Sequence, residues 1–168
     1  MLQLTLIRHA KSSWQAAGLR DFDRPLNTRG LHDAPRMGQR MHEQGLAFDR
    51  IVASPALRAI STARLIAQQL DYPEDAIDRL PPLYEASVDT LLQCVQSFDP
   101  QLSRIALVAH NPGITGLCNF LTGAGVDDLP TGAVAVIEFP LDDWQAVNRD
   151  SGTLKMLLTP KQQDEQHG

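Results

Sequence analysis

The sequence has few cysteines and lacks the short spacings of metal-binding residues. It contains only 2 cysteines in 168 residues, Cys94 and Cys118, and both lie in apolar stretches with helical spacing. Two isolated cysteines do not form a disulfide framework, so we expect reduced thiols in the core of a cytoplasmic protein. The spacings Cys-x-x-Cys and His-x-x-x-His, which are typical of zinc sites, do not occur, and neither do clustered carboxylates. The sequence therefore predicts an activity that needs no metal.

Long apolar runs, nucleotide-binding loops and an excess of basic residues are also lacking. No apolar run approaches the roughly 20 residues that span a bilayer, and the first one stops at Arg8 without the basic leader of a signal peptide. The segment Gly123-Ala124-Gly125 lacks the third glycine of a dinucleotide fingerprint, and there is no Walker lysine motif. The net charge of −5 gives no general attraction to nucleic acid or anionic membranes. We expect no cofactor, no nucleic-acid partner and no membrane partner.

What is present is the composition of an ordinary globular protein. Hydrophobic residues make up 43% of the chain and charged residues 21%, which are usual values for a soluble domain. A chain of this length is large enough to bury one core. We expect a single domain over residues 1–160, followed by a polar C-terminal tail over residues 161–168.

Three short, strongly apolar segments are predicted to be buried strands, at residues 2–7, 50–53 and 105–109. Each is followed by a segment with helical periodicity. These predicted helices begin near Thr28, Ser54 and residue 114, and another helix is predicted from residue 88 to 98, with Ser87 as its N-cap. The histidines of the first helix, His32 and His42, have no partner at metal-binding spacing, and we expect both at the surface.

Basic side chains follow all three of the predicted strands. Arg8 and His9 end the first strand, and His110 directly follows the third. Arg58 lies in the first turns of the helix after the second strand, where a cation is unfavourable unless an anion lies beside it. Each of these could be an ordinary polar loop residue, and Arg58 could be a solvated surface arginine. In open α/β sheets, however, ligands bind beyond the carboxyl ends of the strands. The repeated pattern therefore favours an anion site.

The chemistry that suits two arginines and two histidines is phosphoryl transfer. Arginine presents a planar fork of donors that matches phosphate oxygens, and such donors stabilise the charge on the equatorial oxygens during transfer. A neutral histidine can itself attack phosphorus, and neighbouring cations favour the neutral ring. The leaving group needs a proton, and Glu85 is the candidate acid, a role that typically contributes about 10²–10⁴ in rate. Glu85 also precedes a predicted helix, where a carboxylate is stabilising in any case, so both explanations stay open.

The chain resembles the histidine phosphatase superfamily, which also contains the cofactor-dependent phosphoglycerate mutases. The motifs that carry the resemblance occur in the superfamily's order: Arg8-His9, Ser54-Pro55-Ala56-Leu57-Arg58 with Thr62, Glu85 and His110. The short chain and the stretch Arg8-His9-Ala10-Lys11-Ser12-Ser13-Trp14 look most like the small SixA-type phosphohistidine phosphatases. The resemblance spans residues 2–160 and includes the segment from Arg24 to Gly30.

The resemblance implies a phosphoglycerate mutase-like α/β fold, a three-layer sandwich with a mostly parallel central sheet flanked by helices. Residues 133–139 and 154–158 would supply late strands. It also implies a metal-independent phosphatase in which His9 becomes phosphorylated, while Arg8, Arg58 and His110 bind the phosphate and stabilise charge. In this sequence Ala10 replaces the superfamily's usual glycine, and a positive φ at that position would be strained.

The substrate is the least determined feature. No long insertion separates Arg58 from His110, so there is little chain to cap the site, and an open site suits a phosphorylated protein side chain. We therefore expect a SixA-type protein phosphohistidine phosphatase. A small-molecule phosphomonoesterase of the same superfamily and a non-catalytic phosphate-binding module are the alternatives. A mutase is less favoured because it requires a closed, dry site.

Overall fold

The structure is a computed structural model that describes residues 1–14 and 18–161. Apart from Lys161, the predicted tail lies outside the described residues. The strands are β1 Leu2–Arg8, β2 Arg50–Ala53, β3 Asp78–Arg79, β4 Arg104–Ala109, β5 Val134–Phe139 and β6 Thr153–Leu158. The α-helices are α1 Thr28–Glu43, α2 Leu57–Gln69, α3 Val88–Gln96 and α4 Gly113–Thr122, and the 3-10 helices are η1 Asp21–Asp23, η2 Glu74–Ala76, η3 Pro81–Leu83 and η4 Trp144–Ala146.

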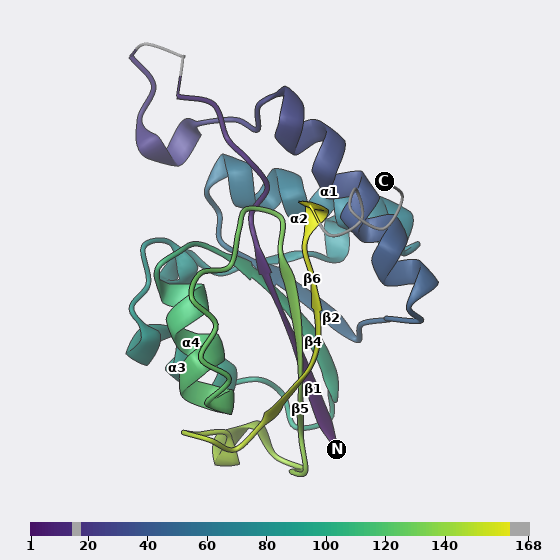
Figure 1. Ribbon diagram of the computed structural model, residues 1–168, viewed down its shortest axis with the longest axis vertical. Coiled ribbons are helices and arrows are strands. Elements are labelled where there is room, and N and C mark those ends of the chain that lie inside the picture. Colours follow the sequence, from purple (N-terminus) through teal and green to yellow (C-terminus); the bar gives the residue numbers. More distant parts are fainter. Residues whose placement is uncertain (15–17, 162–168) are drawn as a thin grey trace.

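The strands form one sheet in the order β3-β2-β4-β1-β5-β6. Strands β3, β2, β4 and β1 run parallel, whereas β5 pairs antiparallel with β1 and β6 pairs antiparallel with β5. Helices α1 and α2 cover one face of the sheet, and α3 and α4 cover the other (Figure 1). This confirms the predicted three-layer sandwich with a mostly parallel sheet, including both late strands.

Alternation along the strands explains why both faces need helices. In β4, Ile105 and Leu107 belong to the core cluster that includes residues of α3 and α4, while Ala106 and Val108 belong to the cluster that includes residues of α1 and α2. Successive side chains of a strand point to opposite faces. Because both sets are apolar, the strand is stable only when each face is covered by helices.

The helix starts differ slightly from those predicted. Asn27, not Thr28, caps α1, because its side chain accepts a hydrogen bond of 2.9 Å from the backbone N–H of Gly30. Helix α2 begins at Leu57 rather than directly after Ser54. Gly30 is needed where α1 crosses the chain after β1, since a Cβ there would lie 2.1 Å from the carbonyl oxygen of Lys11.

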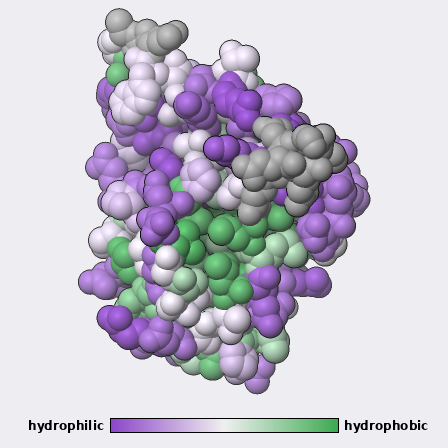
Figure 2. Space-filling view, viewed as in Figure 1, coloured by the Kyte–Doolittle hydropathy of each residue, from purple (hydrophilic) through white to green (hydrophobic). Residues whose placement is uncertain are grey.

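Neither cysteine forms a disulfide, and the face of the molecule in Figure 2 is mostly polar with one apolar area. Cys94 and Cys118 are free, as predicted, and Cys118 is buried. Figure 2 shows an apolar area in the middle of one face, over β5 and β6, where hydrophobic residues of the edge strand β6 are only partly buried. Within the described residues, no helix is both long and apolar enough to cross a bilayer.

Candidate active site

The register of the parallel strands brings the predicted residues to one edge of the sheet. Arg8 pairs with Ala109, so the residues that follow them, His9 and His110, lie side by side. The backbone N–H of His9 donates to the carbonyl of Ala109 at 3.1 Å. The two imidazole centres are 5.1 Å apart. The backbone N–H of Ser54, after β2, donates to the carbonyl of Val108, the residue just before Ala109, at 2.9 Å. The ends of β1, β2 and β4 therefore meet at one place.

The hydrogen bond of His9 fixes its tautomer. Nδ1 lies 2.7 Å from the carbonyl oxygen of Ala10. A carbonyl oxygen can only accept, so Nδ1 must carry a proton. In the neutral ring the lone pair is then on Nε2, which is the nitrogen available for attack on phosphorus. The backbone N–H of Ala10 is held in turn by Thr62 Oγ1 at 2.9 Å.

Three buried donors without a hydrogen-bond partner belong to residues that line one hollow. Among the described residues, Arg8 Nε, Arg58 Nε and His110 Nδ1 are buried side-chain atoms with no hydrogen-bond partner. A buried donor that lacks a partner costs about 1–3 kcal/mol. Such atoms at one point of the molecule indicate a site built to bind an acceptor-rich group, and a phosphoryl group supplies three oxygens.

His110 is oriented from its other side by Ser54. Its Nε2 lies 2.8 Å from Ser54 Oγ, which also accepts the backbone N–H of Ala56 at 3.3 Å. If the Ser54 hydroxyl donates to Nε2, then Nδ1 carries the ring proton and is the buried donor without a partner. The sequence indicates Ser54 as a helix cap and as part of the family motif, but not as a partner of His110, which the structure shows it to be.

Asp21 is a site residue that sequence reasoning did not identify. Its carboxylate accepts from Arg58 Nη2 at 3.0 Å, from Arg24 Nε at 3.1 Å and from the Tyr84 hydroxyl at 2.6 Å. Its backbone carbonyl accepts from Arg58 Nη1 at 2.7 Å. Arg58 is therefore 6% exposed and not a solvated surface arginine. Two of its nitrogens are bound to Asp21, so its orientation is set before a ligand arrives.

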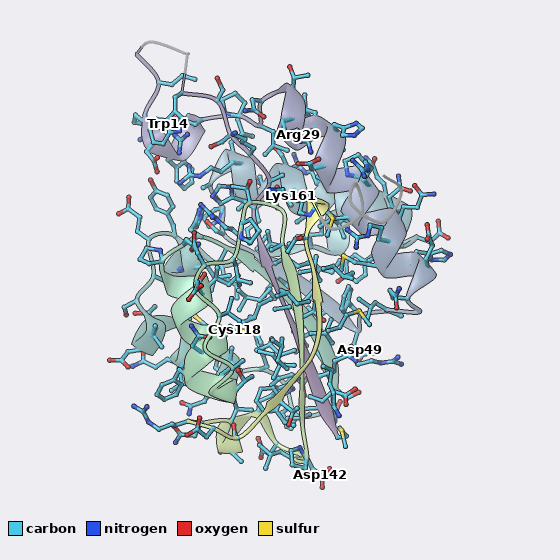
Figure 3. All side chains as sticks on the ribbon, viewed as in Figure 1. Trp14, Arg29, Asp49, Cys118, Asp142 and Lys161 are labelled. Atoms are coloured by element: carbon cyan, nitrogen blue, oxygen red, sulfur yellow. The ribbon has the colours of Figure 1, made fainter. Side chains whose placement is uncertain are left out.

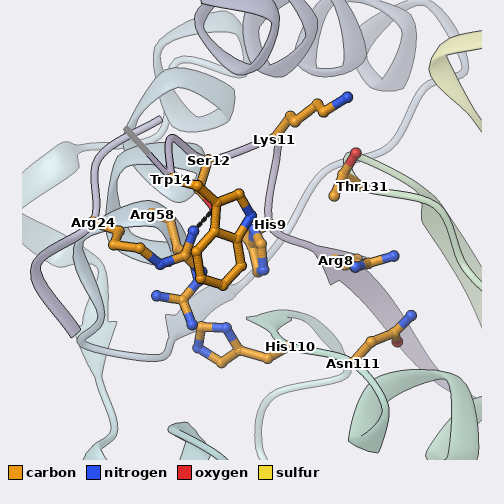
Figure 4. A pocket seen from close by; sticks show the side chains of 10 residues that line it. All are labelled: Arg8, His9, Lys11, Ser12, Trp14, Arg24, Arg58, His110, Asn111 and Thr131. Carbon is orange, nitrogen blue, oxygen red and sulfur yellow. Dashed lines mark hydrogen bonds between the residues drawn. The ribbon is translucent and has the colours of Figure 1, made fainter. Parts of the chain in front are cut away.

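A hollow of about 280 Å³ lies where the strand ends meet (Figure 4). It is lined by Arg8, His9, Lys11, Ser12, Trp14, Arg24, Arg58, His110, Asn111 and Thr131. All four residues predicted to bind phosphate line it. The segment between β1 and α1 adds two cations, Lys11 and Arg24, and the hydroxyl of Ser12. Among the described residues, no cluster of three histidine, cysteine or acidic side chains could hold a metal ion.

Burial and positive charge keep both imidazoles neutral. The pKa of His9 falls to about 4, first because the ring is buried and then because Arg58, Arg8 and Arg24 repel a proton there. The pKa of His110 falls to about 3, again mainly through burial and then through His9 and Arg58. Hydrogen bonds, first from Tyr84 and then from Arg58, lower the pKa of Asp21 to about 2. At neutral pH the site thus holds two neutral imidazoles among arginine cations.

Stability should depend on pH through His9. The ring titrates near 4 in the folded protein instead of 6.5, so between these values the unfolded chain binds a proton that the folded chain does not. The contribution of His9 to the free energy of unfolding is therefore fully present above about pH 6.5 and is lost as the pH drops toward 4. From pH 7 to 5 we expect a loss of about 2 kcal/mol from His9 alone, measured as the free energy of unfolding in urea.

His9→Asn should reduce the change of unfolding free energy with pH, and the surface variant His42→Asn should keep it. A change with pH in His9→Asn equal to that of wild type would refute the lowered pKa of His9.

Glu85 does not line the hollow around His9. It is exposed, has a φ of 54°, and lines a neighbouring hollow together with His110 and Asn111. Its proposed use as an acid stays a prediction. The strain considered for Ala10 does not arise, because Ala10 is not among the described residues with a positive φ. Its methyl group is fully buried.

Comparison with known proteins gives consistent results. Residues 4–91 match the family model of the histidine phosphatase superfamily, branch 1. An uncharacterized protein of Mycobacterium tuberculosis is 30% identical over 141 residues, which are 78% of this chain and 85% of that protein. The structure of the protein histidine phosphatase SixA complexed with tungstate is similar with a TM-score of 0.82 and 24% identity, over 96% of this chain and 99% of that one.

A second similar structure is that of a putative SixA phosphohistidine phosphatase from Agrobacterium tumefaciens, with a TM-score of 0.82 and 25% identity over 95% of this chain and 98% of that one. The matched segment of the family model begins in β1, just before Arg8 and His9, and extends into α3. The chain thus has a SixA-like fold, with His9, His110 and two arginines at the edge of its sheet, and it belongs to the histidine phosphatase superfamily.

Proposed function

We propose that this protein is a phosphatase that forms a covalent phosphohistidine on His9 and acts on phosphohistidine in proteins. The observation that carries the proposal is the tautomer of His9. The Ala10 carbonyl holds the proton on Nδ1, so Nε2 has a lone pair available to a phosphorus atom bound among the partnerless donors of Arg8, Arg58 and His110.

The reaction has two displacements. The lone pair of His9 Nε2 forms a bond to phosphorus while the bond from phosphorus to the leaving nitrogen or oxygen breaks, and the leaving atom takes up a proton from Glu85 or from solvent. A water molecule then attacks the phosphorus of phospho-His9, and the bond from phosphorus to Nε2 breaks. Its electron pair returns to Nε2, which restores the neutral ring, the water's proton passes to Glu85 or to solvent, and inorganic phosphate leaves. The arginines and His110 stabilise charge on the three equatorial oxygens in both steps.

A direct test is a competition between substrates. A phosphohistidine peptide, a phosphotyrosine peptide and small sugar phosphates would be offered to the protein, with release of inorganic phosphate measured against the uncatalysed rate. We expect the highest kcat/KM for the phosphohistidine peptide and no loss of activity with chelator. Higher activity on sugar phosphates would favour the small-molecule phosphomonoesterase, and absence of turnover on every phosphodonor would favour the binding module.

The proton donor is tested separately. We propose Glu85 as the acid for ester substrates, whose alkoxide leaving groups depend on protonation more than an imidazole does. Glu85→Gln should lower kcat on an alkyl phosphate by about 10² and change the rate on phosphohistidine by much less. Asp89→Asn, on the nearby helix α3, is a matched control for loss of one negative charge. An unchanged rate on esters would remove Glu85 from this role.

A further inference from the structure

Trp14 is an exposed aromatic residue at the mouth of the hollow. It follows directly after the stretch that carries His9, and 79% of its surface is exposed. Figure 3 shows it at the end of the molecule opposite Asp142, beyond the carboxyl ends of the parallel strands. Single exposed hydrophobic residues are common on surfaces. Trp14 differs because it lines the same hollow as His9 and Arg58.

The indole of Trp14 is held in place by Arg24. The guanidinium carbon of Arg24 lies 3.5 Å from the centre of the indole ring, a close cation–π stack. Arg24 is itself 8% exposed. Its Nη1 donates to Ser12 Oγ at 2.8 Å, and its Nε donates to Asp21 at 3.1 Å. One face of the indole thus lies against a fixed guanidinium, and the exposure of the residue leaves the other face open.

The backbone before Trp14 is also fixed. The N–H of Ser13 donates to the carbonyl of Pro25 at 2.9 Å, and Ser12 forms an isolated antiparallel bridge with Leu26. The same Asp21 that binds Arg24 binds Arg58. The stacked indole and the phosphate-binding arginine are therefore parts of one connected structure, so the ring is positioned relative to the phosphate before a substrate arrives. Figure 4 shows the indole in front of Arg24 at the hollow.

We propose that Trp14 is a specificity-determining residue that stacks on a planar aromatic leaving group. This rests on the proposed function, because attack by His9 requires the leaving group to lie roughly in line on the far side of phosphorus, toward the mouth of the hollow. The chemistry that fits is the imidazole of phosphohistidine or the phenol of phosphotyrosine. Tyr84, edge-on to His110 with ring centres 5.7 Å apart, adds a second aromatic surface beside the site.

The physical basis is the difference between flat and non-flat leaving groups. Stacking of one planar ring on an aromatic side chain changes affinity by about tenfold or more, whereas a serine side chain or a saturated ring cannot match the flat face of an indole. The contact exists both before and during the reaction, so its loss should raise KM and leave kcat nearly unchanged.

The test compares matched pairs of substrates in Trp14→Ala, Trp14→Phe and the control Leu31→Ala, which truncates an exposed residue of α1. Phenyl phosphate is paired with cyclohexyl phosphate, and phosphohistidine and phosphotyrosine peptides are each paired with a phosphoserine peptide. Trp14→Ala should raise KM about tenfold for the aromatic member of each pair and less than about twofold for the other. Trp14→Phe should recover part of the loss, and Leu31→Ala should change neither. The two peptide arms show which aromatic leaving group depends more on Trp14.

A binding measurement keeps this inference distinct from the proposed function. Calorimetric titration with phenylphosphonate and cyclohexylphosphonate needs no turnover, and Trp14→Ala should weaken only the first. Selective weakening without turnover of any phosphodonor would retain the aromatic site and refute the phosphatase. Equal losses for both members of the pairs would mean that Trp14 only holds Arg24 in place, and unchanged affinities would mean that it contacts no ligand; either result overturns the inference.

Discussion

His9→Ala is expected to lower turnover by about 10⁴ or more and to abolish the phosphoenzyme. Removal of a covalent nucleophile has effects of this size, because the remaining binding groups cannot form the intermediate. The variant would be mixed with a labelled phosphodonor, quenched, and examined for acid-labile, base-stable phosphate on the protein. Wild type should be labelled and His9→Ala should not.

Three further measurements make this test specific. His42→Ala removes an exposed histidine of α1 and should leave both labelling and turnover unchanged. His110→Ala should slow turnover but still allow labelling, because it removes a donor to phosphate and leaves the nucleophile. Free imidazole should restore part of the activity of His9→Ala by occupying the space of the missing ring. Labelling of His9→Ala at the wild-type level would show that another residue is the nucleophile.

Arg58→Ala is expected to lower kcat by about 10²–10³, which is typical for loss of one preorganised donor to a developing charge. The variant removes the buried Nε that has no partner among the described residues and leaves the Asp21 carboxylate without its Arg58 partner. Binding of inorganic phosphate should weaken as well, and calorimetric titration would measure it. Arg58→Lys should recover only part of the activity, since lysine has no planar fork.

The matched control is Arg64→Ala, which removes an arginine from the same helix, α2, outside the hollow. It should keep wild-type kcat and phosphate affinity. Unfolding in urea would be measured for both variants to separate loss of charge from loss of fold. Wild-type kcat in a folded Arg58→Ala would show that the phosphate is bound without this arginine.

The sequence by itself determined where the main strands and helices lie and which residues form the candidate phosphate site. The apolar segments are short, and each is followed by basic residues, so local pattern was enough to predict that Arg8, His9, Arg58 and His110 meet. The parallel pairing of β1 with β4 then makes their meeting a consequence of register. The alternative that Arg58 is a solvated surface arginine was wrong, because Asp21 of η1 binds its guanidinium and covers it.

Only the tertiary structure decided how the site is held and oriented. Asp21, Trp14 and Arg24 lie in a stretch without periodicity, where the sequence offers no spacing from which a contact can be predicted. Tyr84 lies 63 positions from Asp21 along the chain, so their hydrogen bond depends on how separate loops fold over the same strand ends. The tautomer of His9 likewise depends on one carbonyl oxygen, because hydrogen-bond geometry is set by the folded backbone and not by residue type.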